Sequence, residues 1–188
     1  MTATRRVVGI DPSLTSTGIC TALGSSTIGR NVKKDAPDAE RWDRLAFIRD
    51  QVTQWCAPVD NLKTGHDWAM EAPLVVLEGY SYASAHQAHQ VGELGGIVRV
   101  ALHEAGIPFA IVQPTSLKLF ATGKGNAGKD DMKLAAQARL GVTFTGKGSG
   151  DECDATWLWC MGMIHLGSPF ICDLPAKNLT ALEKVEWP

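Results

Sequence analysis

The pattern of apolar and polar positions along the chain predicts a mixed α/β fold. Short apolar runs bounded by turn residues are typical of buried strands, whereas apolar residues at helical spacing predict amphipathic helices. The predicted strands are residues 5–11, 16–23, 26–32, 74–78 and 106–112. The predicted helices are residues 38–56, 84–105, 114–120, 130–140 and 151–166.

The order of these segments predicts a sheet with both strand directions. A Pro-Ser turn joins the first two strands into a hairpin, and the third strand completes a meander. Strand 74–78, helix 84–105 and strand 106–112 form a unit that requires a right-handed parallel crossover. We therefore expect a mixed five-stranded sheet flanked by helices.

Length and composition suit one domain. The chain has 188 residues, of which 45% are hydrophobic, and we expect a domain over residues 1–167 with a peripheral C-terminal extension over 168–188. No apolar run approaches the roughly 20 residues that span a bilayer, so we expect no membrane segment and a cytoplasmic protein. Five cysteines without a CxxC pair predict buried, reduced thiols.

Charge alone does not favour nucleic acid as a partner, because the formal net charge is −2 and the pI is about 6.2. The distribution of charge changes that conclusion. Residues 116–150 hold six basic residues against two aspartates, a local net charge of +4. A local basic surface is therefore compatible with an acidic chain.

Four carboxylates form the main candidate site. Asp11 and Glu78 each end an apolar strand, VVGID and LVVLE, where an unpaired charge is costly to bury. Asp151 and Asp154 open a late helix and project within about 60° of each other, whereas Glu152 faces away. Ligands that are all carboxylate oxygens select hard divalent cations such as Mg²⁺ or Mn²⁺. The pattern therefore indicates a metal site and a nuclease.

Each of these signals also has a structural explanation. Asp11 precedes Pro12, and an Asp-Pro pair after a strand is common in turns. Asp151 and Asp154 lie in a first helical turn, where acids complement the helix dipole. The glycine-rich loop 123–128, followed by Lys129 and Asp130, does not match a Walker A motif.

Taken together in order, the motifs resemble those of the RuvC family of Holliday-junction resolvases, within the RNase H-like superfamily. VVGIDPSLTSTG is similar to the family's first strand and hairpin, LVVLEG to its second acidic strand end, and DECDATWLW to its helical DxxDA motif. The family has two functional lysines eleven residues apart around a Gly-x-Gly loop. Lys118 and Lys129 have this spacing around Gly123-Lys124-Gly125.

The resemblance implies roles for these residues. Asp11, Glu78, Asp151 and Asp154 would be the catalytic metal ligands, with Lys129 beside the scissile phosphate and Lys118 as a supporting phosphate contact. Lys124 is a further candidate for DNA binding. The family's wedge aromatic lies three residues after the glutamate, where this chain has Ser81 between Tyr80 and Tyr82, so either tyrosine is a candidate.

The resemblance also implies a reaction and partners. A homodimer would use two Mg²⁺ or Mn²⁺ ions per active site to nick a four-way DNA junction symmetrically, giving 5′-phosphate and 3′-hydroxyl ends. Its pathway would be DNA recombination and repair, with a branch-migration helicase as candidate partner. The glycines at 92, 95 and 96 make helix 84–105 the candidate dimer surface.

Two alternatives remain at this stage. An RNase H-like nuclease of other specificity would act on flaps, branched replication intermediates or RNA. A junction-binding protein that does not cleave is disfavoured, because all four carboxylates and both lysines are present. A sugar kinase or actin-like ATPase shares the first motif but generally needs two such domains.

Overall fold

The computed structural model describes residues 5–33, 35–57, 72–79, 88–168 and 174–188. Its centre is a five-stranded sheet with strand order β3-β2-β1-β4-β5. The strands are β1 (Val7–Asp11), β2 (Thr17–Thr21), β3 (Gly24–Ile28), β4 (Leu74–Glu78) and β5 (Phe109–Val112). The first three are antiparallel neighbours, whereas β4 pairs parallel with both β1 and β5. The predicted mixed α/β sheet is confirmed.

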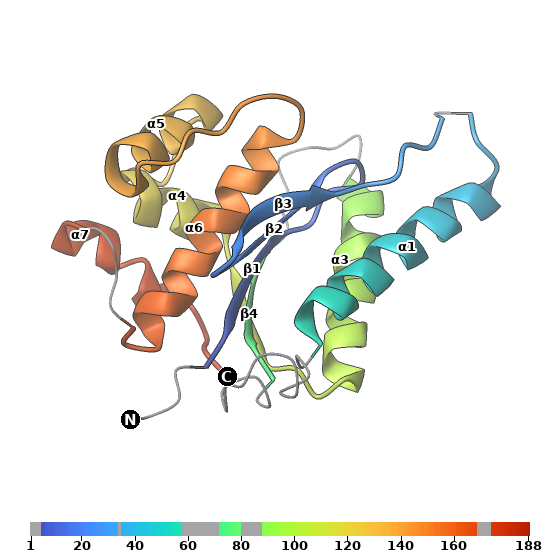
Figure 1. Ribbon diagram of the computed structural model, residues 1–188, viewed down its shortest axis with the longest axis horizontal. Coiled ribbons are helices and arrows are strands. Elements are labelled where there is room, and N and C mark those ends of the chain that lie inside the picture. The colour runs from blue at the N-terminus through green and yellow to red at the C-terminus, as the bar shows by residue number, and fades with distance from the viewer. Residues whose placement is uncertain (1–4, 34, 58–71, 80–87, 169–173) are drawn as a thin grey trace.

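Helices cover both faces of the sheet (Figure 1). One face carries α1 (Asp38–Cys56) and α3 (Ala88–Glu104). The other carries α4 (Pro114–Thr122), α5 (Lys129–Leu140), α6 (Ser149–His165) and α7 (Ala176–Leu179). In the described part of the chain, no helix is long and apolar enough to cross a membrane.

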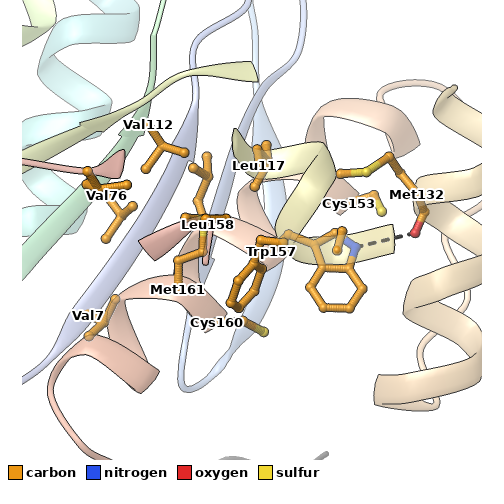
Figure 2. Packing of buried hydrophobic residues seen from close by; sticks show 14 of the residues in the cluster. Val7, Val76, Val112, Leu117, Met132, Cys153, Trp157, Leu158, Cys160 and Met161 are labelled. Atoms are coloured by element: carbon orange, nitrogen blue, oxygen red, sulfur yellow. Dashed lines mark hydrogen bonds between the residues drawn. The ribbon is translucent and has the colours of Figure 1, made fainter. Parts of the chain in front are cut away.

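Alternating residues of the central strands supply two separate cores, as the pleat of a strand requires. Val7 faces the core under α6, while Val8 and Ile10 face the core under α1 and α3. Figure 2 shows the first core around Trp157, which is fully buried and donates its indole N–H to the carbonyl of Met132 at 3.3 Å. This bond joins α6 to α5.

Three details of the prediction are wrong. The third strand is Gly24–Ile28 and not 26–32, because Thr21 pairs with Gly24 and leaves only two residues in the turn. Helix α6 begins at Ser149, two residues before the predicted start. The last strand is Phe109–Val112 and begins three residues after the predicted start at residue 106.

The C-terminal segment packs against the domain. Ala181 and Val185 belong to the core beneath α6. Asn178 is buried and donates its side-chain amide to the carbonyl of Phe120 on α4 at 2.7 Å. The domain boundary at residue 167 stays a prediction, but residues after it help to bury the end of α4.

The predicted state of the cysteines is confirmed for the described residues. Cys20, Cys56, Cys153 and Cys160 are buried thiols. Cys172 lies outside the described residues.

Candidate active site

Strand pairing brings Asp11 and Glu78 together. Strands β1 and β4 are parallel neighbours with Ile10 opposite Leu77, so the next residue on each strand is one of these two acids. Both carboxylates therefore lie at the same edge of the sheet, where the strands end. In α/β folds this edge is where ligand sites collect.

Helix α6 adds the other two carboxylates, and two glycines allow it to approach the sheet. A Cβ on Gly9 would lie 2.5 Å from the backbone nitrogen of Trp159 and closer still to the carbonyl of Ala155. A Cβ on Gly18 would overlap the carbonyl of Asp151. Backbone therefore packs on backbone. The first turn of α6 lies directly over β2, and later turns of the helix lie over β1.

The four predicted carboxylates line one cavity of about 770 Å³. Lys118 and Lys129 line the same cavity, from α4 and from the first residue of α5. The chain turns between these two helices at Gly123, which ends α4 with a positive φ of 79°. This turn brings two lysines that are eleven residues apart in sequence to a common site.

Burial and neighbouring acids make Asp11 hard to ionise. Its side chain is buried at the end of β1, and burial raises its pKa well above the usual value. The charge of Glu78 and a side-chain hydrogen bond with Glu78 raise the pKa further, as do Asp154 and Asp151. Glu78 also has a raised pKa because of burial, opposed by the hydrogen bond with Asp11 and by the charge of Lys118. The two acids share one hydrogen bond, with the proton favoured on Asp11.

Asp154 shows the same effect on the helix side. Burial, followed by the charge of Glu78, raises its pKa to about 7. The positive charge of Lys129 opposes this rise. The acids therefore repel one another across the cavity, and the two lysines compensate for only part of that repulsion.

Asp151 and Glu152 point to different partners. The hydroxyl of Ser16 donates a hydrogen bond to Oδ2 of Asp151, which lines the cavity. The hydroxyl of Ser25 donates to Oε1 of Glu152 at 2.7 Å, and Glu152 does not line the cavity. The prediction that Glu152 faces away from the other carboxylates is consistent with this arrangement.

The donor set has the chemistry of a site for a hard cation. Four carboxylates that repel one another supply oxygen ligands and gain from a positive charge placed between them. Among the described residues, no group of three acidic, histidine or cysteine side chains is already arranged to hold a metal ion. The residues fit such an ion by type and by shared cavity, without a preformed coordination sphere.

The other residues predicted to bind DNA lie outside the cavity or outside the described residues. Lys124 is exposed and does not line the cavity. Tyr80 and Tyr82 lie outside the described residues. His89 and Arg99 line the cavity from α3 together with Gly92 and Gly95, and sequence reasoning assigned no role to Arg99. These four positions recur at intervals of three or four residues, a helical spacing that could have indicated a common face.

The sheet order, the helices on both faces and the acidic strand ends define an RNase H-like α/β protein. The solved structure of Thermus thermophilus RuvC superposes with a TM-score of 0.55 at 24% identity, covering 87% of this chain and 97% of that one. A second structure, T. thermophilus RuvC in complex with Holliday junction substrate, gives a TM-score of 0.53 at 22% identity, covering 87% of this chain and 97% of that one. These likenesses show the fold.

Sequence comparison establishes the family, although no family model matches the chain. The crossover junction endodeoxyribonuclease RuvC of Anaeromyxobacter dehalogenans strain 2CP-1 is 38% identical over 158 residues, covering 79% of this chain and 75% of the relative. RuvC of Thermus thermophilus is 29% identical over 143 residues, covering 72% of this chain and 80% of the relative. The chain belongs to the RuvC family of nucleases. Membership suggests dependence on a divalent metal ion.

Proposed function

We propose that this chain is a structure-selective endodeoxyribonuclease that resolves four-way DNA junctions by paired nicks. The observation that carries the proposal is the shared cavity, in which four carboxylates and two lysines meet at the ends of β1 and β4. Its membership of a family whose relatives are crossover junction endodeoxyribonucleases supports the same substrate. The products would be 5′-phosphate and 3′-hydroxyl ends.

Asp11, Glu78, Asp151 and Asp154 would hold two Mg²⁺ or Mn²⁺ ions. When bound, these ions would supply an activated water and neutralise charge on the leaving oxygen. The protein contributes the placement of the ligands, because Asp11 and Glu78 are fixed by the sheet and the other two by the first turns of α6. The raised pKa values of Asp11 and Asp154 mean that a cation must displace protons to bind there.

Lys129 would contact the scissile phosphate, with Lys118 in support. Both line the cavity, and the charge of each lowers the pKa of Glu78 and of Asp154. A lysine already held beside the reacting group stabilises charge that develops on phosphoryl oxygens. Lys129 is exposed, so a DNA backbone can reach it, whereas Lys118 is half-buried.

Further DNA contacts would extend from this cavity. Lys124 lies in the loop between α4 and α5, at the exposed side of the same helix pair. His89 and Arg99 line the cavity from α3 and would face the DNA strand from the opposite side. Tyr80 or Tyr82 would act as the wedge at the junction.

A second copy of the chain would bind at the outer side of α1 and α3. A groove of about 450 Å³ lies there. Its lining combines apolar residues, among them Trp42, Ile97 and Val100, with the charged residues Arg49, Glu93 and Glu104. Trp42 and Val100 are each 56% exposed, and Gly96 presents open space in which another chain could approach.

Val100→Asp should therefore give a monomer by light scattering, while the distant exposed substitution Leu134→Asp should not. If Val100→Asp still forms dimers, this groove is not the dimer interface.

The substrate is tested by comparing four DNA and hybrid molecules of matched sequence. A synthetic four-way junction, a flap, a linear duplex and an RNA–DNA hybrid would be incubated with Mg²⁺, Mn²⁺ or EDTA. We expect symmetric nicks in the junction that depend on metal and that a ligase reseals. Preferential cleavage of the flap or of the hybrid would replace this proposal with an RNase H-like nuclease of other specificity.

The site is tested by two substitutions in the same helical turn. Asp154→Asn should abolish cleavage while leaving junction binding largely intact, because it removes a carboxylate that lines the cavity. Glu152→Gln is the matched control, since Glu152 faces Ser25 and lies outside the cavity lining. Equal cleavage by wild type and Asp154→Asn would disprove the assigned site. Junction binding without cleavage by the wild type, in every metal, would favour a binding protein.

A further inference from the structure

We propose that Ser16 is a positioning residue that holds the carboxylate of Asp151 in one orientation, in which it binds a divalent cation. The inference rests on the proposed metal site and adds to it a residue that does not itself contact metal or DNA. It assigns a function to the loop between β1 and β2, which carries Ser16 to the first turn of α6.

The contact on which the proposal stands joins the loop to the helix. Ser16 donates its hydroxyl to Oδ2 of Asp151, across 135 residues of sequence. A hydrogen bond to a carboxylate is stronger than one between neutral groups and fixes the torsion angles of both side chains. The hydroxyl therefore holds the carboxylate of Asp151 in a fixed orientation at the cavity that it lines.

The loop that carries Ser16 is itself held firmly. The fully buried Thr17 donates its hydroxyl to the carbonyl of Ser13 at 2.6 Å and accepts the backbone N–H of Ser13 at 3.1 Å. These two bonds close a turn of five residues, 13–17. The serine hydroxyl is therefore presented by a preorganised loop rather than by a loose one.

Helix α6 is equally well fixed beneath it. A Cβ on Gly148, the residue that precedes α6, would lie 3.1 Å from Cβ of Ser16. A Cβ on Gly18 would overlap the carbonyl of Asp151. Gly148 therefore packs against the side chain of Ser16, and Gly18 packs against the backbone of Asp151. The side chain of Asp151 is the part of this contact that can still rotate, and the Ser16 hydroxyl restrains it.

A second serine, on strand β3 of the same antiparallel meander, provides a matched control. Ser25 donates to Glu152 at 2.7 Å, so it also joins the hairpin to the first turn of α6 through a serine–carboxylate bond. Glu152 does not line the cavity. Ser16→Ala, in the loop between β1 and β2, and Ser25→Ala, on β3, therefore each remove one serine–carboxylate bond to the first turn of α6, and only the first bond involves a proposed metal ligand.

The experiment measures Mn²⁺ binding to the full chain by isothermal titration calorimetry without DNA, with thermal melting as a check of folding. Removing a hydrogen-bond partner of a metal ligand typically weakens binding by roughly 10- to 100-fold, so we expect Ser16→Ala to raise the Kd on the order of 10-fold. Ser25→Ala should bind Mn²⁺ as the wild type does. Ser16→Thr, which keeps the hydroxyl, should restore binding.

Any other outcome contradicts the inference, and the pattern among the variants shows which step has failed. If the wild type binds no Mn²⁺, the proposed metal site fails and this inference fails with it. If the wild type binds and Ser16→Ala binds equally well, only the positioning role fails. If Ser25→Ala weakens Mn²⁺ binding as much as Ser16→Ala does, the cause is a general loosening of the contact between the strands and α6. A folded Ser16→Thr that binds poorly would show that the hydroxyl is not responsible, and this variant keeps the test decisive if the alanine variant unfolds.

Discussion

The carboxylate cluster should destabilise the metal-free protein, and Asp154→Asn should reveal by how much. Burial and the charge of Glu78 raise the pKa of Asp154 from its ordinary 3.8 to about 7. The folded state therefore retains a proton that the unfolded state releases between these two pH values. The contribution of this proton to stability is fully present below about pH 4 and is lost as the pH rises through about 7. Asparagine is neutral at every pH and removes this dependence.

The magnitude follows from the size of the shift. A difference of about 3 pKa units corresponds to roughly 4 kcal/mol at about pH 8, since each unit is worth about 1.36 kcal/mol. At about pH 5 the same relation gives roughly 2 kcal/mol. In EDTA, the asparagine variant should be the more stable protein by these amounts, with the larger gain at high pH.

Urea unfolding at the two pH values, in EDTA and then in Mn²⁺, measures this difference. Mn²⁺ should stabilise the wild type more than the variant, because the variant lacks one proposed ligand. Glu152→Gln, in the same helical turn but outside the cavity lining, should change stability by no more than about 0.5 kcal/mol. A wild type that is at least as stable as Asp154→Asn at the higher pH in EDTA would refute the reasoning.

Three further substitutions test other parts of the structure. Gly9→Ala should lower stability by about 3 kcal/mol or more, because its Cβ would overlap the carbonyl of Ala155, and thermal melting followed by circular dichroism would show this. Asn178→Leu should cost about 1–3 kcal/mol in urea unfolding, since the carbonyl of Phe120 loses its donor. Lys129→Ala should slow junction cleavage by about 100-fold or more in single-turnover assays, with a much smaller change in a gel-shift binding assay.

Much of the sheet could be predicted because its signals are local. The runs VVGID and LVVLE end in a carboxylate, and strand order then places those carboxylates side by side. The parallel pairing of β4 with β5 followed from the crossover unit, so no distant contact had to be known. These are the parts of the site that the strands alone determine.

Other parts depend on contacts between distant segments. The start of α6 at Ser149 and the bond from Ser16 to Asp151 need the hairpin and the helix to be docked, and the sequence pattern does not contain that docking. The exposure of Trp42 on α1 also depends on such docking, because this residue fits an apolar pattern yet lies at the exposed groove. A hydrophobic residue at a surface of this kind has the same local pattern as a core residue.

The close packing of α6 on β1 and β2 has a consequence for how the protein can change. Gly9 and Gly18 bring the helix backbone against the strand backbones, so the separation between Asp11 and the acids of α6 does not depend on the size of core side chains. Substitutions among the apolar residues around Trp157 should then alter stability while leaving the cleavage rate per folded molecule nearly constant. The interior of this nuclease can diverge in sequence without moving its acidic residues, whereas those two glycines cannot be replaced.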